Sequence, residues 1–260
     1  MKAYLRLFRE VFVANLASVL EYRISFLVQF FGMMLNNASF LVFWLVLIDH
    51  TGPIGGWGFG DVLFLWALSP AAFGLAHVVC GNVRQIGALI VQGDLDVYLL
   101  QPKDPWFHSI ISRTVPSAWG DLIYGFVLLP FLTQDPVKIG LFVVFTVTGA
   151  LVFVGTFALM QTLAFWLGNI SGLAGALTEF LLSFTLYPET VFPQEMRWVF
   201  YSLIPAGFLV FLPIHVLRTL DWIWLPVILG TAVGLCVLSW WLFQAGLKRY
   251  ESGNAIGSRI

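Results

Sequence analysis

Residues 82–104 form a polar segment between two long apolar stretches, and they read NVRQIGALIVQGDLDVYLLQPKD. The charged residues of this segment stand out in a chain that is only 10% charged: Arg84, Asp94, Asp96, Lys103 and Asp104. The segment begins with the spacing of a short amphipathic helix, breaks at Gly93 and ends between Pro102 and Pro105. A loop that only turned the chain around would need no such organisation. We therefore predict that the polar segment is held by a partner in water.

The composition of the rest of the chain is that of a membrane protein. The 260 residues are 59% hydrophobic and 17% aromatic, with a mean hydropathy of +0.89. Soluble domains are about 45–50% apolar, so a soluble fold could not bury this much apolar surface. The net charge of −1 and the lack of a run of Lys and Arg exclude a nucleic-acid-binding protein.

Six apolar stretches are long enough, or nearly so, to cross a bilayer core of about 30 Å as helices. They are residues 24–48, 60–81, 107–132, 139–167, 170–187 and 222–245. Their apolar runs are continuous, whereas membrane strands alternate, so a helical bundle is favoured over a barrel. The sequence predicts an all-α polytopic membrane protein with six transmembrane helices in one domain, residues 1–260.

The distribution of Lys and Arg predicts the orientation of these helices. With the N-terminus in the cytoplasm, all of the 13 Lys and Arg residues except Lys138, Arg197 and Arg218 lie on or near the cytoplasmic side. Both termini and the polar segment are therefore expected in the cytoplasm.

Two further segments are apolar in part, but they are not expected to cross the membrane. In residues 1–23, an apolar stripe of Leu5, Phe8, Phe12, Leu16 and Val19 predicts an amphipathic helix in the inner interface. Residues 188–221 are apolar, but they are interrupted by Pro193, Pro205 and Pro213. Because proline breaks helices, we expect two short helices that enter the outer leaflet and return, not a seventh span.

The catalytic and nucleotide-binding motifs that a membrane enzyme would use are missing from the sequence. No GxxxxGK[ST] loop is present, and the four histidines lie far apart without metal-ligand spacing. We expect no metal site, no bound cofactor and no catalytic activity in this chain.

Two acidic residues lie inside expected spans, and each should face protein or water because a charge is costly in lipid. For Asp121, pairing with a neighbouring helix is favoured; for Glu179, a structural and a functional role are weighted evenly. Gly168, Gly172 and Gly175 predict close packing of the fourth and fifth spans. Gly230 and Gly234 predict either such packing or contact with a partner subunit.

The order of these parts resembles the permease of ABC-2 type transporters, whose fold is shared with sterol and polysaccharide exporters of the type V class. Three stretches carry the resemblance to a bacterial subfamily: Gly93–Pro102 (GDLDVYLLQP), Tyr187–Gly207 and Leu247–Ser252. Where relatives often have a basic residue before the proline of the first stretch, this chain has Gln101.

The resemblance implies a permease subunit of an exporter in the bacterial inner membrane, which works by alternating access. A second permease, identical or homologous, would form the other half of the path, and a dimeric cytoplasmic ATPase would bind ATP and Mg²⁺. It implies a coupling role for part of the polar segment: Val83, Arg84, Gln85, Ile86, Leu89, Ile90, Gly93, Asp94, Leu95, Asp96, Tyr98 and Pro102. Glu179, Phe184 and Tyr187 are the expected lining of the translocation path.

Two other classes of function stay open. The chain would be a membrane scaffold if it recruited cytoplasmic proteins without transport. It would be a lipid-modifying enzyme if scattered groups such as Asp121, Glu179 and His77 converged at the headgroup level. The substrate is not indicated by the sequence.

Overall fold

The computed structural model describes residues 2–202 and 204–250, and the regular structure in these ranges is helical. The longer helices are α1 (Lys2–Glu21), α2 (Arg23–Thr51), α3 (Phe59–Val79), α7 (Ala118–Leu132), α8 (Pro136–Thr162), α10 (Ser171–Thr185) and α13 (Leu225–Leu247). The shorter elements are η1 (Val83–Gln85), α4 (Ile86–Gln92), α5 (Asp96–Leu99), α6 (Pro105–Ile111), α9 (Ala164–Leu167), η2 (Glu189–Val191), α11 (Gln194–Phe200), η3 (Gly207–Phe211), α12 (Leu212–Thr219) and η4 (Trp222–Trp224).

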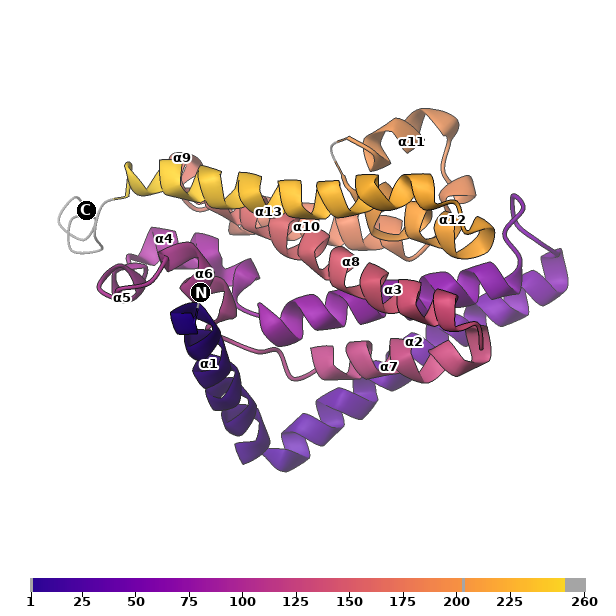
Figure 1. Cartoon of the computed structure of the whole chain (residues 1–260), viewed down its shortest axis with the longest axis horizontal. Coiled ribbons are helices and arrows are strands. Elements are labelled where there is room, and N and C mark those ends of the chain that lie inside the picture. The colour runs from indigo at the N-terminus through magenta and orange to yellow at the C-terminus, as the bar shows by residue number, and fades with distance from the viewer. Residues whose placement is uncertain (1, 203, 251–260) are drawn as a thin grey trace.

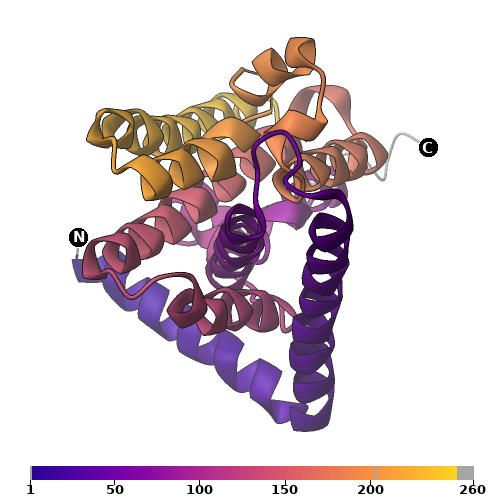
Figure 2. The ribbon, with the colours of Figure 1, turned by 90° about the vertical axis from the view of Figure 1, so that its right-hand side faces the viewer.

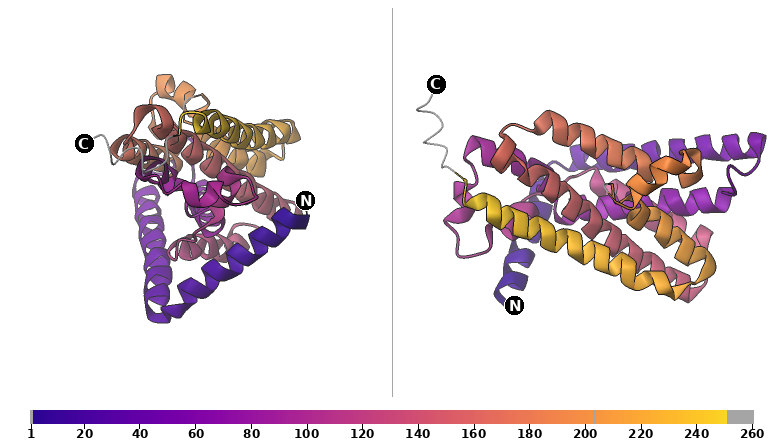
Figure 3. Two further views of the ribbon diagram at one scale, coloured as in Figure 1. Left: turned by 90° about the vertical axis from the view of Figure 1, so that its left-hand side faces the viewer. Right: turned by 90° about the horizontal axis from the view of Figure 1, so that it is seen from above.

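The long helices run along the long axis of the molecule, and α1 lies across them (Figure 1). Helices α4, α5 and α6 lie at one end, which we call the α4 end; the loop of residues 52–58 lies at the other, which we call the α11 end (Figures 1 and 3). Helix α3 is mostly buried, whereas α2 and α13 expose most of their apolar surface. That surface suits lipid or another subunit.

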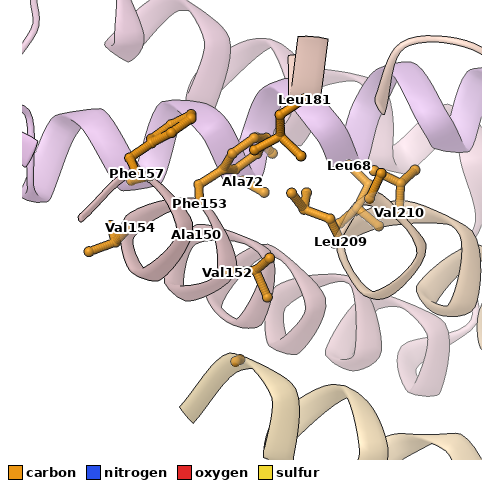
Figure 4. Packing of buried hydrophobic residues seen from close by; sticks show 14 of the residues in the cluster. Leu68, Ala72, Ala150, Val152, Phe153, Val154, Phe157, Leu181, Leu209 and Val210 are labelled. Atoms are coloured by element: carbon orange, nitrogen blue, oxygen red, sulfur yellow. The ribbon is translucent and has the colours of Figure 1, made fainter. Parts of the chain in front are cut away.

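The core forms where α3, α8, α10 and η3 meet, as Figure 4 shows. Phe153 and Phe157 of α8 stack on each other with ring centroids 5.6 Å apart, and both are buried. Leu181 of α10 and Leu209 of η3 are fully buried in the same cluster. Close packing of this kind holds the short helices against the long ones.

Close approach between helices depends on glycines that the spacing of small residues did not indicate. A Cβ at Gly74 of α3 would meet the backbone of Leu122 in α7, and one at Gly125 of α7 would meet the carbonyl of Ala67 in α3. The predicted packing role of Gly172 and Gly175 is wrong, because a Cβ there meets no described atom within 4 Å. Small residues allow close approach only on the face that has a neighbour.

Four of the expected spans are long and apolar enough to cross a membrane: Arg23–Thr51, Phe59–Val79, Pro136–Leu167 and Trp222–Leu247. The expected span 107–132 is not one helix, since residues 112–117 interrupt it between α6 and α7. Helices α7 and α10 have 15 residues each, which gives about 22 Å at 1.5 Å per residue. The count of six spans therefore stays a prediction.

Helix α1 has the length expected of the interfacial segment, and it packs beneath the bundle without a fully buried residue. The amide of Asn15 donates to the carbonyl of Ile111 at 3.0 Å, which ties α1 to α6. Phe8 packs partly against the core, whereas Leu5 is exposed.

Residues 188–221 form η2, α11 and one continuous helix made of η3 and α12. Pro193 and Pro205 precede the starts of α11 and η3, as expected, whereas Pro213 lies inside the continuous helix and does not break it. Residues 188–221 pack over the loop that joins α2 to α3 (Figure 2). Arg218 pairs with Asp61 at the start of α3 and lies 4.7 Å from the ring centroid of Trp57. These contacts fix the broken segment at the α11 end of the molecule.

Candidate functional site: a two-faced polar segment and a polar cavity

The polar segment 82–104 has one face that is part of the protein core. Val83, Ile86 and Leu95 are fully buried, and Ile90 is 5% exposed. These side chains pack against the bundle and leave no surface for another protein. The apolar stripe of α4 attaches the segment to its own bundle, and the coupling role that the resemblance implied for these residues stays a prediction.

Hydrogen bonds attach the same face to the neighbouring helices. The side-chain amide of Asn82 donates to the carbonyl of Ser109 at 2.9 Å. The backbone N–H of Gly87 donates to Oε1 of Gln161 in α8 at 3.2 Å. A Cβ at residue 87 would meet that oxygen, so the Gln161 side chain would have to move to accommodate it. A displacement of α4 would therefore be transmitted to α8.

The turn at the end of α4 is also anchored. Gly93 adopts a left-handed conformation with φ of 82°, which glycine tolerates at a helix C-terminus. The phenol of Tyr250 donates to the carbonyl of Gly93 at 2.8 Å, and the phenol of Tyr98 donates to Ser112 Oγ at 3.0 Å. Burial first, and then the nearby carboxylate of Asp96, raise the pKa of Tyr250 to about 12. The phenol therefore remains a donor at physiological pH.

The other face of the segment is exposed at the α4 end. Its exposed residues are Gln85, Gln92, Asp94, Val97, Leu99, Leu100, Gln101 and Pro102. Val97 is 61% exposed and Leu100 is 87% exposed. This face contains exposed apolar side chains together with side-chain amides and the carboxylate of Asp94, and such a mixture suits a protein-binding surface. Leu89 is only partly exposed.

Arg84 and Glu179, far apart in sequence, are brought together beside the segment. Arg84 Nη2 lies 3.9 Å from Oε1 of Glu179 on α10, and the Glu179 side chain is 74% exposed. A pair this exposed and this long contributes little to stability. The pair shows instead that the start of the polar segment lies beside α10.

A cavity of about 580 Å³ lies between α2, α3, α4, α8 and α10 at the α4 end. Arg84, His77 and Gln161 are on its wall, together with Ser171 and Gly175 of α10. The sequence did not indicate this cavity, because its walls come from segments up to about 140 positions apart and show no common spacing. The one signal was the unusual number of polar side chains near the ends of apolar stretches.

The two aromatic residues expected along the translocation path differ in position. Phe184 is 3% exposed and packs against Phe192 and Phe200, with ring centroids 5.0 and 4.7 Å away. It is a core residue, so the prediction that it lines the path is wrong. Tyr187 is 40% exposed and lies edge-on to Trp44 of α2, with centroids 5.9 Å apart.

Asp121 pairs with a neighbouring helix, as the sequence favoured. It is buried in α7, and its Oδ1 accepts a hydrogen bond from the amide of Asn37 in α2 at 2.6 Å. Tyr124 donates to the carbonyl of the same Asn37 at 3.3 Å. Among the described residues, no group of three His, Cys, Asp or Glu side chains is placed to hold a metal ion.

Long apolar helices, a polar segment anchored at one end and a polar cavity beside it define a multi-pass membrane protein with a site for a partner or solute. The chain belongs to the ABC-2 family transporter proteins, whose family model matches residues 34–254. It is therefore a membrane permease component of an ABC transporter, and membership implies a separate cytoplasmic ATPase subunit. No curated protein and no solved structure matches the sequence significantly. Residues Glu251 and Ser252 of the C-terminal stretch, and Arg259, lie outside the described residues.

Proposed function

We propose that this chain is one half of the translocation path of a bacterial exporter, and that the exposed face of residues 82–104 receives the ATPase. The observation that carries the proposal is the division of this segment into two faces. One face is fixed to α8, α6 and the end of α13, and the other presents Asp94, Val97 and Leu100 outward. A segment built in this way transmits motion from a partner into the bundle.

The proposed mechanism is alternating access driven by ATP in the partner. ATP and Mg²⁺ bind the ATPase dimer, and its closure moves the polar segment. The free energy comes from the tighter binding of ATP to the closed ATPase state. Hydrogen bonds from Asn82 and Gly87 connect the segment to the bundle at 2.9 and 3.2 Å, which supports direct transmission.

The proposed second permease, a copy or a homologue, lies against α2 and α10. Glu179 and Ser183 of α10 are exposed, and so is Tyr187, two residues after its end. A charged side chain facing lipid at membrane depth costs about 2.5–3.5 kcal/mol on insertion scales, so this face is better suited to protein or water. Glu179 and Tyr187 are our candidates for the lining of the path.

The proposed location is the bacterial inner membrane, with the α4 end and both termini in the cytoplasm. The excess of Lys and Arg at that end supports this orientation. Residues 188–221 then lie in the outer leaflet, where their contacts with Ile54 and Asp61 hold them over the outer end of α3.

The test is co-purification of the tagged chain with the product of the neighbouring ATPase gene, followed by ATP hydrolysis and transport assays in proteoliposomes. The critical variant is Asp94→Lys, and the matched control is Glu195→Lys, an exposed carboxylate on α11 at the other end. We expect Asp94→Lys to weaken ATPase binding by about tenfold, or about 1.4 kcal/mol, and Glu195→Lys to have no effect.

Two results would refute the proposal. One is failure to recover any ATPase with the wild-type chain. The other is normal ATPase binding and transport by Asp94→Lys. A scaffold protein would instead bind the ATPase normally, while ATP hydrolysis would drive no transport into or out of the proteoliposomes.

A further inference from the structure

His77 presents an unsatisfied acceptor in the wall of the cavity. Its side chain is 2% exposed, and Nδ1 lies 2.9 Å from the carbonyl oxygen of Phe73. A carbonyl only accepts, so Nδ1 carries the proton, and Nε2 of the neutral ring has a free lone pair. Nε2 has no hydrogen-bond partner among the described residues. Buried polar atoms are normally paired, so Nε2 needs an O–H or N–H donor, which either an ordered water or a ligand in the adjoining cavity could supply.

Gln161 presents the complementary group. Its Oε1 already accepts the N–H of Gly87 at 3.2 Å, which orients the side chain. The amide NH₂ is therefore the part of Gln161 that remains for a ligand, and it only donates. Gln161 is 8% exposed and lines the same cavity as His77.

Arg84 gives the cavity its positive charge. It is the charged residue among the described lining residues, and Nη2 lies 3.9 Å from Glu179, beyond hydrogen-bond distance. Its guanidinium donors therefore remain for an anion. Helix α10 also begins at the cavity, where Asn169 and Ser171 form part of the wall. The N-terminal end of a helix favours negative charge.

We infer that this cavity is a binding site for a phosphate ester that carries a free hydroxyl group. The phosphate would accept hydrogen bonds from Arg84 and Gln161, near the N-terminus of α10. The hydroxyl would donate to Nε2 of His77. Both the headgroup of a glycerol-phosphate lipid and a water-soluble sugar phosphate have this chemistry.

A ligand in this cavity would contact two parts of the protein with proposed functions at once. Arg84 and Gln85 belong to the polar segment, whereas Ser171 and Gly175 belong to α10. A bound phosphate ester would therefore contact both the segment proposed to receive the ATPase and the helix proposed to face the second permease. The binding site itself rests on neither proposal, since it lies within one chain.

The test measures binding to the purified full chain, without ATPase. The lipid probes are dioctanoyl phosphatidylglycerol and dioctanoyl phosphatidylpropanol, which differ in the headgroup hydroxyls but have the same charge. The soluble probes are glycerol 1-phosphate and propyl phosphate. Dissociation constants come from titrations followed by native mass spectrometry, and thermal unfolding shows that each variant is folded.

One pair of variants blocks the cavity without disturbing the fold. Gly175 lines the cavity, and Gly172, on the same helix, does not. A Cβ at either position meets no described atom within 4 Å, so a side chain can begin at both, and thermal unfolding checks that each leucine variant folds. We expect Gly175→Leu to abolish binding and Gly172→Leu to leave it unchanged.

The second set of variants assigns the two halves of the ligand. Arg84→Gln should weaken the phosphatidylglycerol and phosphatidylpropanol complexes alike by roughly 10- to 100-fold, the effect of one charged hydrogen bond. Arg113→Gln, at an exposed arginine outside the cavity, is the control. The wild-type chain should prefer phosphatidylglycerol by about fivefold, and His77→Phe should remove this preference only.

The results separate the two sources of ligand. Binding of the lipid pair alone supports a headgroup site, and binding of glycerol 1-phosphate with the same dependence on Arg84 and His77 supports a soluble ligand. Equal binding by Gly175→Leu and Gly172→Leu would overturn the inference. So would a preference for phosphatidylglycerol that persists in His77→Phe.

Discussion

Leu100 and Leu95 lie five positions apart in the polar segment, and they should affect different properties of the protein. Leu100 is 87% exposed, whereas Leu95 is fully buried against the bundle. If the exposed face receives the ATPase, Leu100 becomes buried only in the complex. Replacement of Leu100 by Asp should therefore change ATPase affinity, and replacement of Leu95 by Ala should change the stability of the permease alone.

The magnitudes follow from the exposed fractions. Burial of a leucine contributes about 1.5–3 kcal/mol, so Leu100→Asp should weaken ATPase binding by roughly 10- to 150-fold. The free energy of unfolding should change by less than about 0.5 kcal/mol, as for surface substitutions in general. Leu95→Ala should lower the free energy of unfolding by about 2–5 kcal/mol, because it removes buried methyl groups and leaves a cavity.

The assay uses the permease in lipid nanodiscs, with ATPase binding measured by interferometry and unfolding measured by thermal melting. Phe131→Asp is the control, since Phe131 is 78% exposed on α7 at the opposite end. Wild-type affinity in Leu100→Asp would refute the assignment of this face. Loss of ATPase binding in Phe131→Asp would also refute it, because a charge anywhere on the surface would then suffice.

Three further predictions test the packing and the anchors. Gly74→Ala should lower the free energy of unfolding by about 1–3 kcal/mol, because the added methyl group pushes α3 away from α7. The control Gly32→Ala, which has open space around it, should be neutral or stabilising. Equal melting temperatures for the two variants would contradict this prediction. Asp121→Ala should lower the free energy of unfolding by about 1–3 kcal/mol, because the buried amide of Asn37 loses its partner. If the role of Asp121 is structural, the Asp121→Asn variant should transport normally. Loss of transport in a folded Asp121→Asn variant would assign Asp121 a function. Because the pKa of Tyr250 is raised in the folded protein, its contribution to stability is complete below about pH 10 and is lost as the pH rises towards 12. The melting temperatures of the wild type and of Tyr250→Phe, plotted against pH, should therefore converge across this range. A constant difference between them would exclude the phenol as the cause.

The long apolar stretches were the part of the fold that the sequence predicted best. Four expected spans coincide with long helices to within a few residues, because a bilayer-sized apolar run has few alternatives to a helix. The stretch 107–132, expected as one helix, is divided into two for a local reason. Pro116 and the polar residues around it end the helix at residue 111, and the new helix begins at Ala118. Average hydropathy over the whole stretch conceals such a break.

The orientation of the polar segment could not be predicted from its pattern. The spacing of Val83, Ile86 and Ile90 correctly indicates one apolar face. An apolar stripe predicts burial, but it does not specify whether the neighbour is the same chain or a partner. The cavity was beyond prediction for a related reason, since His77, Arg84 and Gln161 line one cavity only after α3, η1 and α8 have packed.

The glycines of α10 show what the failed packing prediction implies for assembly. Gly172 meets no described neighbour, and it begins an exposed face that continues through Ala176, Glu179 and Ser183 at intervals of three or four residues. A face with small residues at this spacing permits close helix approach, and a glutamate on it disfavours lipid. Apart from the ion pair of Glu179 with Arg84, these side chains are exposed in the described chain, and the composition of this face suits a helix of another subunit. We therefore expect cysteines introduced at Gly172 and Ala176 to cross-link between permease subunits, whereas a cysteine at Val147, on the exposed side of α8, should not.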